Sequence, residues 1–211
     1  MDEKSEKYIE LLCEALQMFY KNDAEALFFD AMPIGERSMV GCVYRYLWAL
    51  RHSPRYDKLE PDVDIEYDRM QKQAQNDTSY LRKALDCSYT KCPHYSSGCW
   101  HEIKQRIPEQ NCTCGERLKK FIPDLIIHQR NVGAGKNGLI VEFKKDGENL
   151  EWDKLKVQFC SCPKSNFKYT VGALVVFDKF SCQVEVYHGY GAPRQKREVS
   201  TSRIMILSNA L

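Results

Sequence analysis

The chain of 211 residues lacks any apolar run long enough to cross a lipid bilayer, so we expect no membrane span. Its charged N-terminus, residues 1–7, lacks the apolar core of a signal peptide, which favours a cytoplasmic protein. Neither sign of charge dominates, since the net charge is +2, and overall basicity therefore does not point to nucleic acid. A nucleic-acid enzyme is still allowed, because only one face of such a protein needs to be positive.

The chain also lacks a Cys-x2-Cys pair, although it contains ten cysteines. Five of them fall within residues 87–114, together with His94 and His101. This segment has few aliphatic residues and could not form a core alone, whereas a tetrahedral zinc ion held by four of its side chains would order it. The preferred zinc ligands are Cys92, Cys99, Cys112 and Cys114, and Cys87 or His94 could replace one of them. The alternative is a loop of free thiols, which is common in cytosolic proteins.

Hydrophobic periodicity predicts an α/β fold. Apolar residues at a helical spacing predict helices at 4–21, 35–51 and 150–160. Alternating or continuous apolar runs predict strands at 63–70, 123–128, 139–144, 169–177 and 182–188. Residues 194–203 are expected to be a polar connection, and 204–207 an edge strand or a helical turn. We expect one domain over residues 1–211, with a helical N-terminus at 1–30 and a Cys/His-rich insertion at 87–115.

The most informative stretch is residues 123–144, two apolar strands joined by a Gly-rich turn. Side chains alternate along a strand, so Glu142 and Lys144 share one face of the second strand. A tight hairpin would bring Asp124, at the start of the first strand, beside Glu142. Burying such charges is costly unless a partner or a metal offsets the cost. Two carboxylates and an ammonium group at the edge of an apolar sheet therefore indicate a divalent-metal site with a lysine that handles water.

Each piece of this pattern also has a simpler interpretation. A Glu-x-Lys pair on a strand is commonly a solvated face that forms cross-strand charge pairs. A Pro-Asp step before a strand is commonly a turn. However, residues 125–127 and 139–141 are continuous apolar runs, which is typical of strands buried on both faces. Charges at the ends of such strands favour a functional site.

The steps Pro123-Asp124 and Glu142-x-Lys144 together resemble the signature of the PD-(D/E)xK nuclease superfamily, whose members have the restriction-endonuclease-like fold. The resemblance covers about residues 35–190, because Glu36 opens a helix before the sheet and residues 153–158 lie on the helix after the motif. More narrowly, the chain resembles a group of small prokaryotic proteins of this superfamily. The resemblance implies a mixed sheet flanked by helices, with the Cys-rich segment as an insertion.

This resemblance implies a nuclease that hydrolyses phosphodiester bonds of nucleic acid, DNA more than RNA. It implies that Asp124 and Glu142, with the backbone carbonyl of Phe143, bind Mg²⁺ or Mn²⁺. Lys144 would orient or deprotonate the attacking water and counter charge in the transition state. Because an ammonium group beside two carboxylates keeps its proton firmly, a role as base is the weaker of these two.

Other residues receive roles from the same resemblance. Glu36 would hold a second metal ion directly or through water, and Lys154 and Gln158 would contact phosphate. Some nucleases of this superfamily carry an iron–sulfur cluster, but their cysteines flank the nuclease core at both ends, unlike those at 87–114. The alternative function is an inactive nucleic-acid-binding or protein-interaction module on a nuclease-like fold. A homodimer is compatible with either function.

Overall fold

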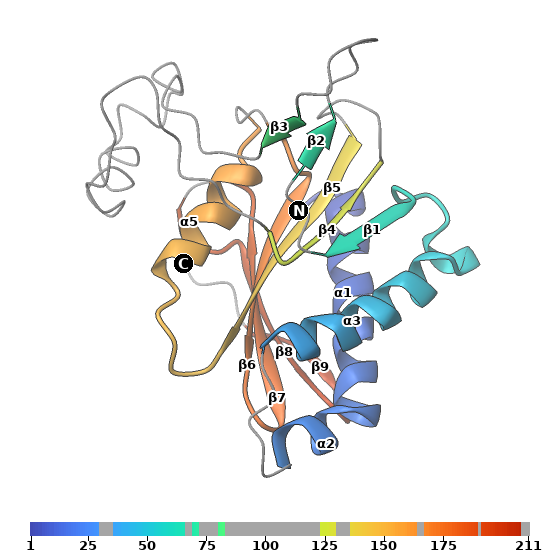
Figure 1. The fold of residues 1–211 in the computed structure, drawn as a ribbon, viewed down its shortest axis with the longest axis vertical. Coiled ribbons are helices and arrows are strands. Elements are labelled where there is room, and N and C mark those ends of the chain that lie inside the picture. The colour runs from blue at the N-terminus through green and yellow to red at the C-terminus, as the bar shows by residue number, and fades with distance from the viewer. Residues whose placement is uncertain are drawn as a thin grey trace.

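The computed structural model in Figure 1 describes residues 1–29, 36–65, 69–71, 80–82, 123–129, 136–163, 167–189 and 191–207. The Cys/His-rich insertion expected at 87–115 lies outside the described residues. The zinc site expected there, including Cys87, Cys92, His94, Cys99, Cys112 and Cys114, therefore stays a prediction.

A seven-stranded mixed sheet forms the centre of the described structure, in the order β1-β4-β5-β6-β7-β8-β9. Strands β5 and β6 are parallel, and every other neighbouring pair in this sheet is antiparallel. The strands are β1 (Asp62–Ile65), β4 (Leu125–His128), β5 (Asn137–Lys145), β6 (Val171–Phe177), β7 (Ser181–Tyr187), β8 (Gln195–Ser200) and β9 (Ile204–Leu207). A separate antiparallel pair consists of β2 (Arg69–Gln71) and β3 (Tyr80–Arg82). The expected hairpin of residues 123–144 is confirmed as the antiparallel pair β4 and β5.

Helices flank this sheet on both faces, which agrees with the mixed sheet flanked by helices that the resemblance implied. They are α1 (Glu3–Asn22), α2 (Ala24–Phe29), α3 (Glu36–Arg51), the 3₁₀ turn η1 (Pro54–Tyr56) and α5 (Glu151–Cys160). Figure 1 shows α1 and α3 on one side of the sheet and α5 on the other. The start of α1 is fixed by Asp2, whose carboxylate accepts a hydrogen bond from the Ser5 backbone N–H at 2.8 Å. Among the described helices, none is both long and apolar enough to span a bilayer.

The main core lies between the sheet and the pair α1 and α3, where the side chains of Leu139, Val141 and Phe143 are fully buried. A smaller cluster under α5 contains Val157, Leu174 and Tyr187. Because side chains alternate along β5, Glu142 and Lys144 point away from the main core, toward the α5 side. The sheet therefore separates the main core from the face on which Glu142 and Lys144 lie.

The crossover from β5 through α5 to β6 brings charge to that second face. Parallel strands need such a connection, and α5 packs back onto the two strands it joins. Close packing is possible because β6 has Gly172 beneath the helix, where an added Cβ would lie 2.5 Å from Val157 Cγ1. The inner side of α5 is thus held directly above β5 and β6.

Two expectations about strands were wrong. The strand expected at 63–70 ends at Ile65 in β1, and residues 69–71 pair with β3 instead. The polar connection expected at 194–203 contains β8, which pairs with both β7 and β9. The polar composition of residues 194–203 hid this strand from sequence analysis. Arg197 and Val199 both point inward in β8, but a charged residue at an inward position does not indicate a buried strand. That guanidinium is buried and is neutralised by an ion pair with Glu6 of α1.

We predict that Gly138→Ala lowers the free energy of unfolding by about 1–3 kcal/mol, because a methyl group there would overlap the buried ring of Tyr8 from α1. Gly41→Ala in α3 is the matched control, since a Cβ there meets nothing within 4 Å. The control should leave stability unchanged or raise it by up to about 1 kcal/mol, because Ala favours helix. Urea denaturation of the two variants measures both changes. Equal stabilities would contradict the packing of α1 on β5.

Candidate active site

A group of charged side chains meets where β4, β5, α3 and α5 come together. We call it the charged cluster. It contains four carboxylates and two lysines: Glu36, Asp124, Glu142, Asp153, Lys144 and Lys156. The sequence predicted four of these six residues, and the structure brings those four into one cluster.

Asp124 stands directly before β4 and is held by the backbone of β5. Its Oδ2 accepts a hydrogen bond from the Phe143 N–H at 2.8 Å, which extends the β4–β5 pairing past Leu125 and Val141. Burial raises the pKa of Asp124, and the Phe143 N–H and the nearby lysines only partly oppose this. The hydrogen bond therefore fixes the carboxylate of a half-buried residue.

Glu142 is the most buried charge of the cluster, with only 1 % of its surface exposed. Its Oε2 accepts a hydrogen bond from Lys156, whereas its Oε1 is buried without a hydrogen-bond partner among the described residues. Burial, followed by the negative charge of Asp124, raises the pKa of Glu142 well above its ordinary value, and Lys156 opposes this rise. An unpaired buried carboxylate oxygen is costly, so this atom indicates where a cation would be stabilised.

The two residues of α5 in the cluster are Asp153 and Lys156. They stand three positions apart on one side of the helix, and Lys156 Nζ lies 2.6 Å from Asp153 Oδ1. Burial lowers the pKa of Lys156, but the charges and hydrogen bonds of Glu142 and Asp153 more than compensate and hold it above its ordinary value. Lys156 is therefore an ammonium group fixed between two carboxylates.

Lys144 links the strand to the first turn of α3. Its Nζ lies 3.3 Å from Glu36 Oε2, 3.8 Å from Asp153 Oδ2 and 3.9 Å from Glu148 Oε2. Burial alone would lower the pKa of Lys144, but Asp153 and Glu36 raise it, so the side chain keeps its proton. Burial raises the pKa of Glu36, and Lys144 partly opposes that effect.

These residues fit a hard divalent cation better than they fit zinc. When all are ionised, the four carboxylates outnumber the two lysines, so the cluster has an excess of negative charge that such a cation would offset. Among the described residues, no group of three or more His, Cys, Asp or Glu side chains could hold a metal ion. Mg²⁺ does not need such a group, because it commonly binds one or two carboxylates and keeps several waters or substrate phosphates. Asp124 and Glu142 match that requirement, and the Phe143 carbonyl is the further oxygen that the resemblance implies.

Lys154 and Gln158, expected to contact phosphate, make other contacts. Lys154 Nζ lies 3.2 Å from Glu185 Oε2, and the Gln158 side-chain amide donates to the Gly191 carbonyl at 2.8 Å. The resemblance pointed to residues 153–158 of α5, but the sequence assigned no role to Asp153 or Lys156. Asp153 and Lys156 are three residues apart, and the apolar Val157 follows Lys156. This spacing indicates that all three side chains lie on the side of the helix that faces the sheet.

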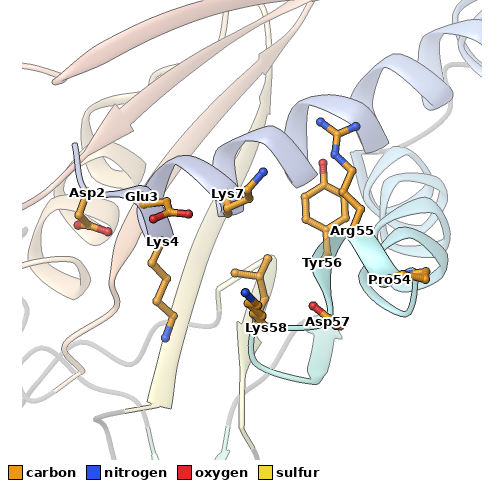
Figure 2. A pocket seen from close by; sticks show the side chains of 10 residues that line it. Asp2, Glu3, Lys4, Lys7, Pro54, Arg55, Tyr56, Asp57 and Lys58 are labelled. Carbon is orange, nitrogen blue, oxygen red and sulfur yellow. The ribbon is translucent and has the colours of Figure 1, made fainter.

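A separate hollow of about 730 Å³ lies between the start of α1 and η1, and none of its lining residues belongs to the charged cluster. Figure 2 shows Lys4, Lys7, Arg55 and Lys58 around it, together with acidic side chains. Lys4 pairs with Glu60 at 2.6 Å, and Arg55 forms an ion pair with Glu14. Because acidic side chains form ion pairs with Lys4 and Arg55, the hollow does not present a concentrated positive charge to an anion.

Comparisons of the chain with protein-family models, with curated proteins and with solved structures each find no match.

We predict that Asp124→Asn stabilises the metal-free protein at neutral pH, because the amide oxygen can still accept from Phe143 N–H while the charge facing Glu142 is removed. Asp124→Ala should be less stable than Asp124→Asn by about 1–3 kcal/mol, since it leaves that N–H without its acceptor. Thermal denaturation in EDTA measures the order of the three proteins.

The advantage of Asp124→Asn should depend on pH. Both Asp124 and Glu142 have a raised pKa in the folded chain, so the folded state binds protons more tightly than the unfolded state. Their contribution to stability is therefore lost as pH rises from about 4, the ordinary carboxyl range, toward the raised values. The difference between Asp124→Asn and the parent protein should grow over that interval. A constant difference would contradict the burial of these two charges.

Proposed function

We propose that the protein is a divalent-metal-dependent nuclease that hydrolyses phosphodiester bonds of nucleic acid, DNA in preference to RNA. The observation that carries this proposal is the buried Glu142 carboxylate, which has one oxygen free and lies within the electrostatic influence of Asp124. A carboxylate so placed is poorly suited to a structural role, because its free oxygen is not compensated within the described protein. A divalent cation would compensate it.

The arrangement of elements supports a restriction-endonuclease-like fold within this proposal. The β4–β5 hairpin carries Pro123-Asp124 and Glu142-x-Lys144, and α5 follows as the crossover to the parallel strand β6. Glu36 opens α3, a helix that precedes the hairpin in the chain. This order and the mixed sheet agree with the layout that the sequence resembles.

Asp124 and Glu142 would hold Mg²⁺ or Mn²⁺ through Glu142 Oε1 and the Asp124 carboxylate, with the Phe143 carbonyl as a third oxygen. Bound there, the cation would supply charge neutralisation at the scissile phosphate and a more acidic water. Burial of Glu142 strengthens this interaction, since the effective dielectric around it is low. The Phe143 N–H keeps Asp124 in place, so the site needs little reorganisation to bind the cation.

Lys144 would act as a proton-bearing group that orients water and counters negative charge in the transition state. Its raised pKa, caused by Asp153 and Glu36 against the opposing effect of burial, argues for a donor and not a base. Glu36 holds Lys144 from the side of α3 and would contact a second cation directly or through water.

The direct test is a cleavage assay on single- and double-stranded DNA and RNA with Mn²⁺ and with EDTA. We expect cleavage with Mn²⁺ alone, and its loss in Asp124→Asn and in Glu142→Gln, which keep side-chain size but lose ligand charge. Cleavage that persists in both variants would move the chemistry elsewhere. No cleavage of any substrate by the parent protein would favour the nucleic-acid-binding or protein-interaction module.

We predict that Lys144→Met lowers the cleavage rate by at least about 100-fold, the usual cost of losing a well-placed charge in a transition state. The fold should persist, because Lys144 lies at the rim of the sheet and its side chain is 22 % exposed. Lys145→Met is the matched control, since its side chain points to the opposite face of β5. Single-turnover rates of the two variants decide the matter. A loss of equal size in both would contradict the assigned role of Lys144.

A further inference from the structure

We infer that Lys156 is a positioning residue that holds Glu142 by one carboxylate oxygen so that the other is free to bind the divalent cation. This inference rests on the proposed function, because it concerns the cation that the nuclease would use. It adds a role for α5 that neither the Asp124/Glu142 pair nor Lys144 supplies.

The contacts of Lys156 fix its position. Its Nζ donates to Glu142 Oε2 and lies 2.6 Å from Asp153 Oδ1, and only 7 % of the residue is exposed. Asp153 is itself buried and comes one turn earlier on the same helix. The ammonium group is therefore held from two sides, and it holds the Glu142 carboxylate in turn.

The two oxygens of Glu142 are consequently different. Oε2 accepts from Lys156, whereas Oε1 is buried and has no hydrogen-bond partner within the part of the chain that the structure describes. Asp124 acts on the same carboxylate through its charge and is anchored to the neighbouring residue Phe143. A cation bound to Oε1 and to Asp124 can be accommodated while Lys156 stays on Oε2. Groups that orient a ligand in this way commonly decide how tightly the metal binds.

A competing interpretation is that Lys156 substitutes for the cation and must leave before it binds. The two interpretations predict opposite signs. Removal of a competitor, and of a positive charge, would strengthen cation binding, whereas removal of a positioning group would weaken it. The free Oε1 favours the positioning role, because the atom available to the cation is the one that Lys156 does not use.

The test is Mn²⁺ binding to the full chain, measured by isothermal titration calorimetry and by electron paramagnetic resonance of free Mn²⁺. We expect Lys156→Met to weaken binding by at least about tenfold, the lower end of the usual effect of losing a group that orients a ligand. Lys156→Arg should restore the affinity to within about threefold, because it keeps the charge and the donors. Lys154→Met is the matched control on the same helix and should bind as the parent protein does, since Lys154 pairs with Glu185.

If Lys156→Met does not fold, Lys156→Gln replaces it in the test, because the uncharged glutamine amide can still donate a hydrogen bond to Glu142. It should bind more weakly than the parent protein but more tightly than Lys156→Met. Unchanged or tighter Mn²⁺ binding by folded Lys156→Met or Lys156→Gln overturns the inference and leaves the nuclease proposal standing. Mn²⁺ binding with the predicted order but without cleavage supports the role of Lys156 and overturns the nuclease proposal. Absence of Mn²⁺ binding by the parent protein overturns both.

Discussion

The site depends on one unfavourable arrangement, a carboxylate buried beside a second carboxylate. Glu142 is almost inaccessible to water, and both burial and Asp124 disfavour its charged form. Lys156 offsets part of this cost at one oxygen only. Such strain is common where a site must bind a cation, because the same repulsion that destabilises the metal-free protein is relieved by the cation. The rest of the described structure holds this arrangement in place.

The fold supplies the arrangement through one unit, β5–α5–β6, and the strand β4 beside it. The hairpin fixes Asp124 against the backbone of β5, and the crossover helix brings Asp153 and Lys156 over the same strand. The first turn of α3 adds Glu36 beside Lys144. The main core on the opposite face of the sheet is apolar, and it stabilises these elements without sharing their charges.

Glu36 was placed at the site only by the family resemblance. Periodicity and local motifs were enough to predict helices α1, α3 and α5, the β4–β5 hairpin, and the closeness of Asp124, Glu142 and Lys144. These residues were predictable because strand alternation and an antiparallel turn determine which side chains can meet. Lys156 was not predicted, because its partner Glu142 lies on another element and only the packing of α5 over Gly172 brings them together. Strand β8 was missed for a similar reason, since the buried Arg197 is explained only by its ion pair with Glu6 of α1.

The central claim is that Glu142 and Asp124 share a divalent cation while Lys156 stays on the other oxygen of Glu142. Anomalous diffraction from crystals grown with Mn²⁺ tests it most directly. The account predicts a peak bonded to Glu142 Oε1 and the Asp124 carboxylate at about 2.1 Å, with Lys156 still bonded to Oε2. Crystals with Mn²⁺ bound elsewhere and no peak between these carboxylates would contradict it.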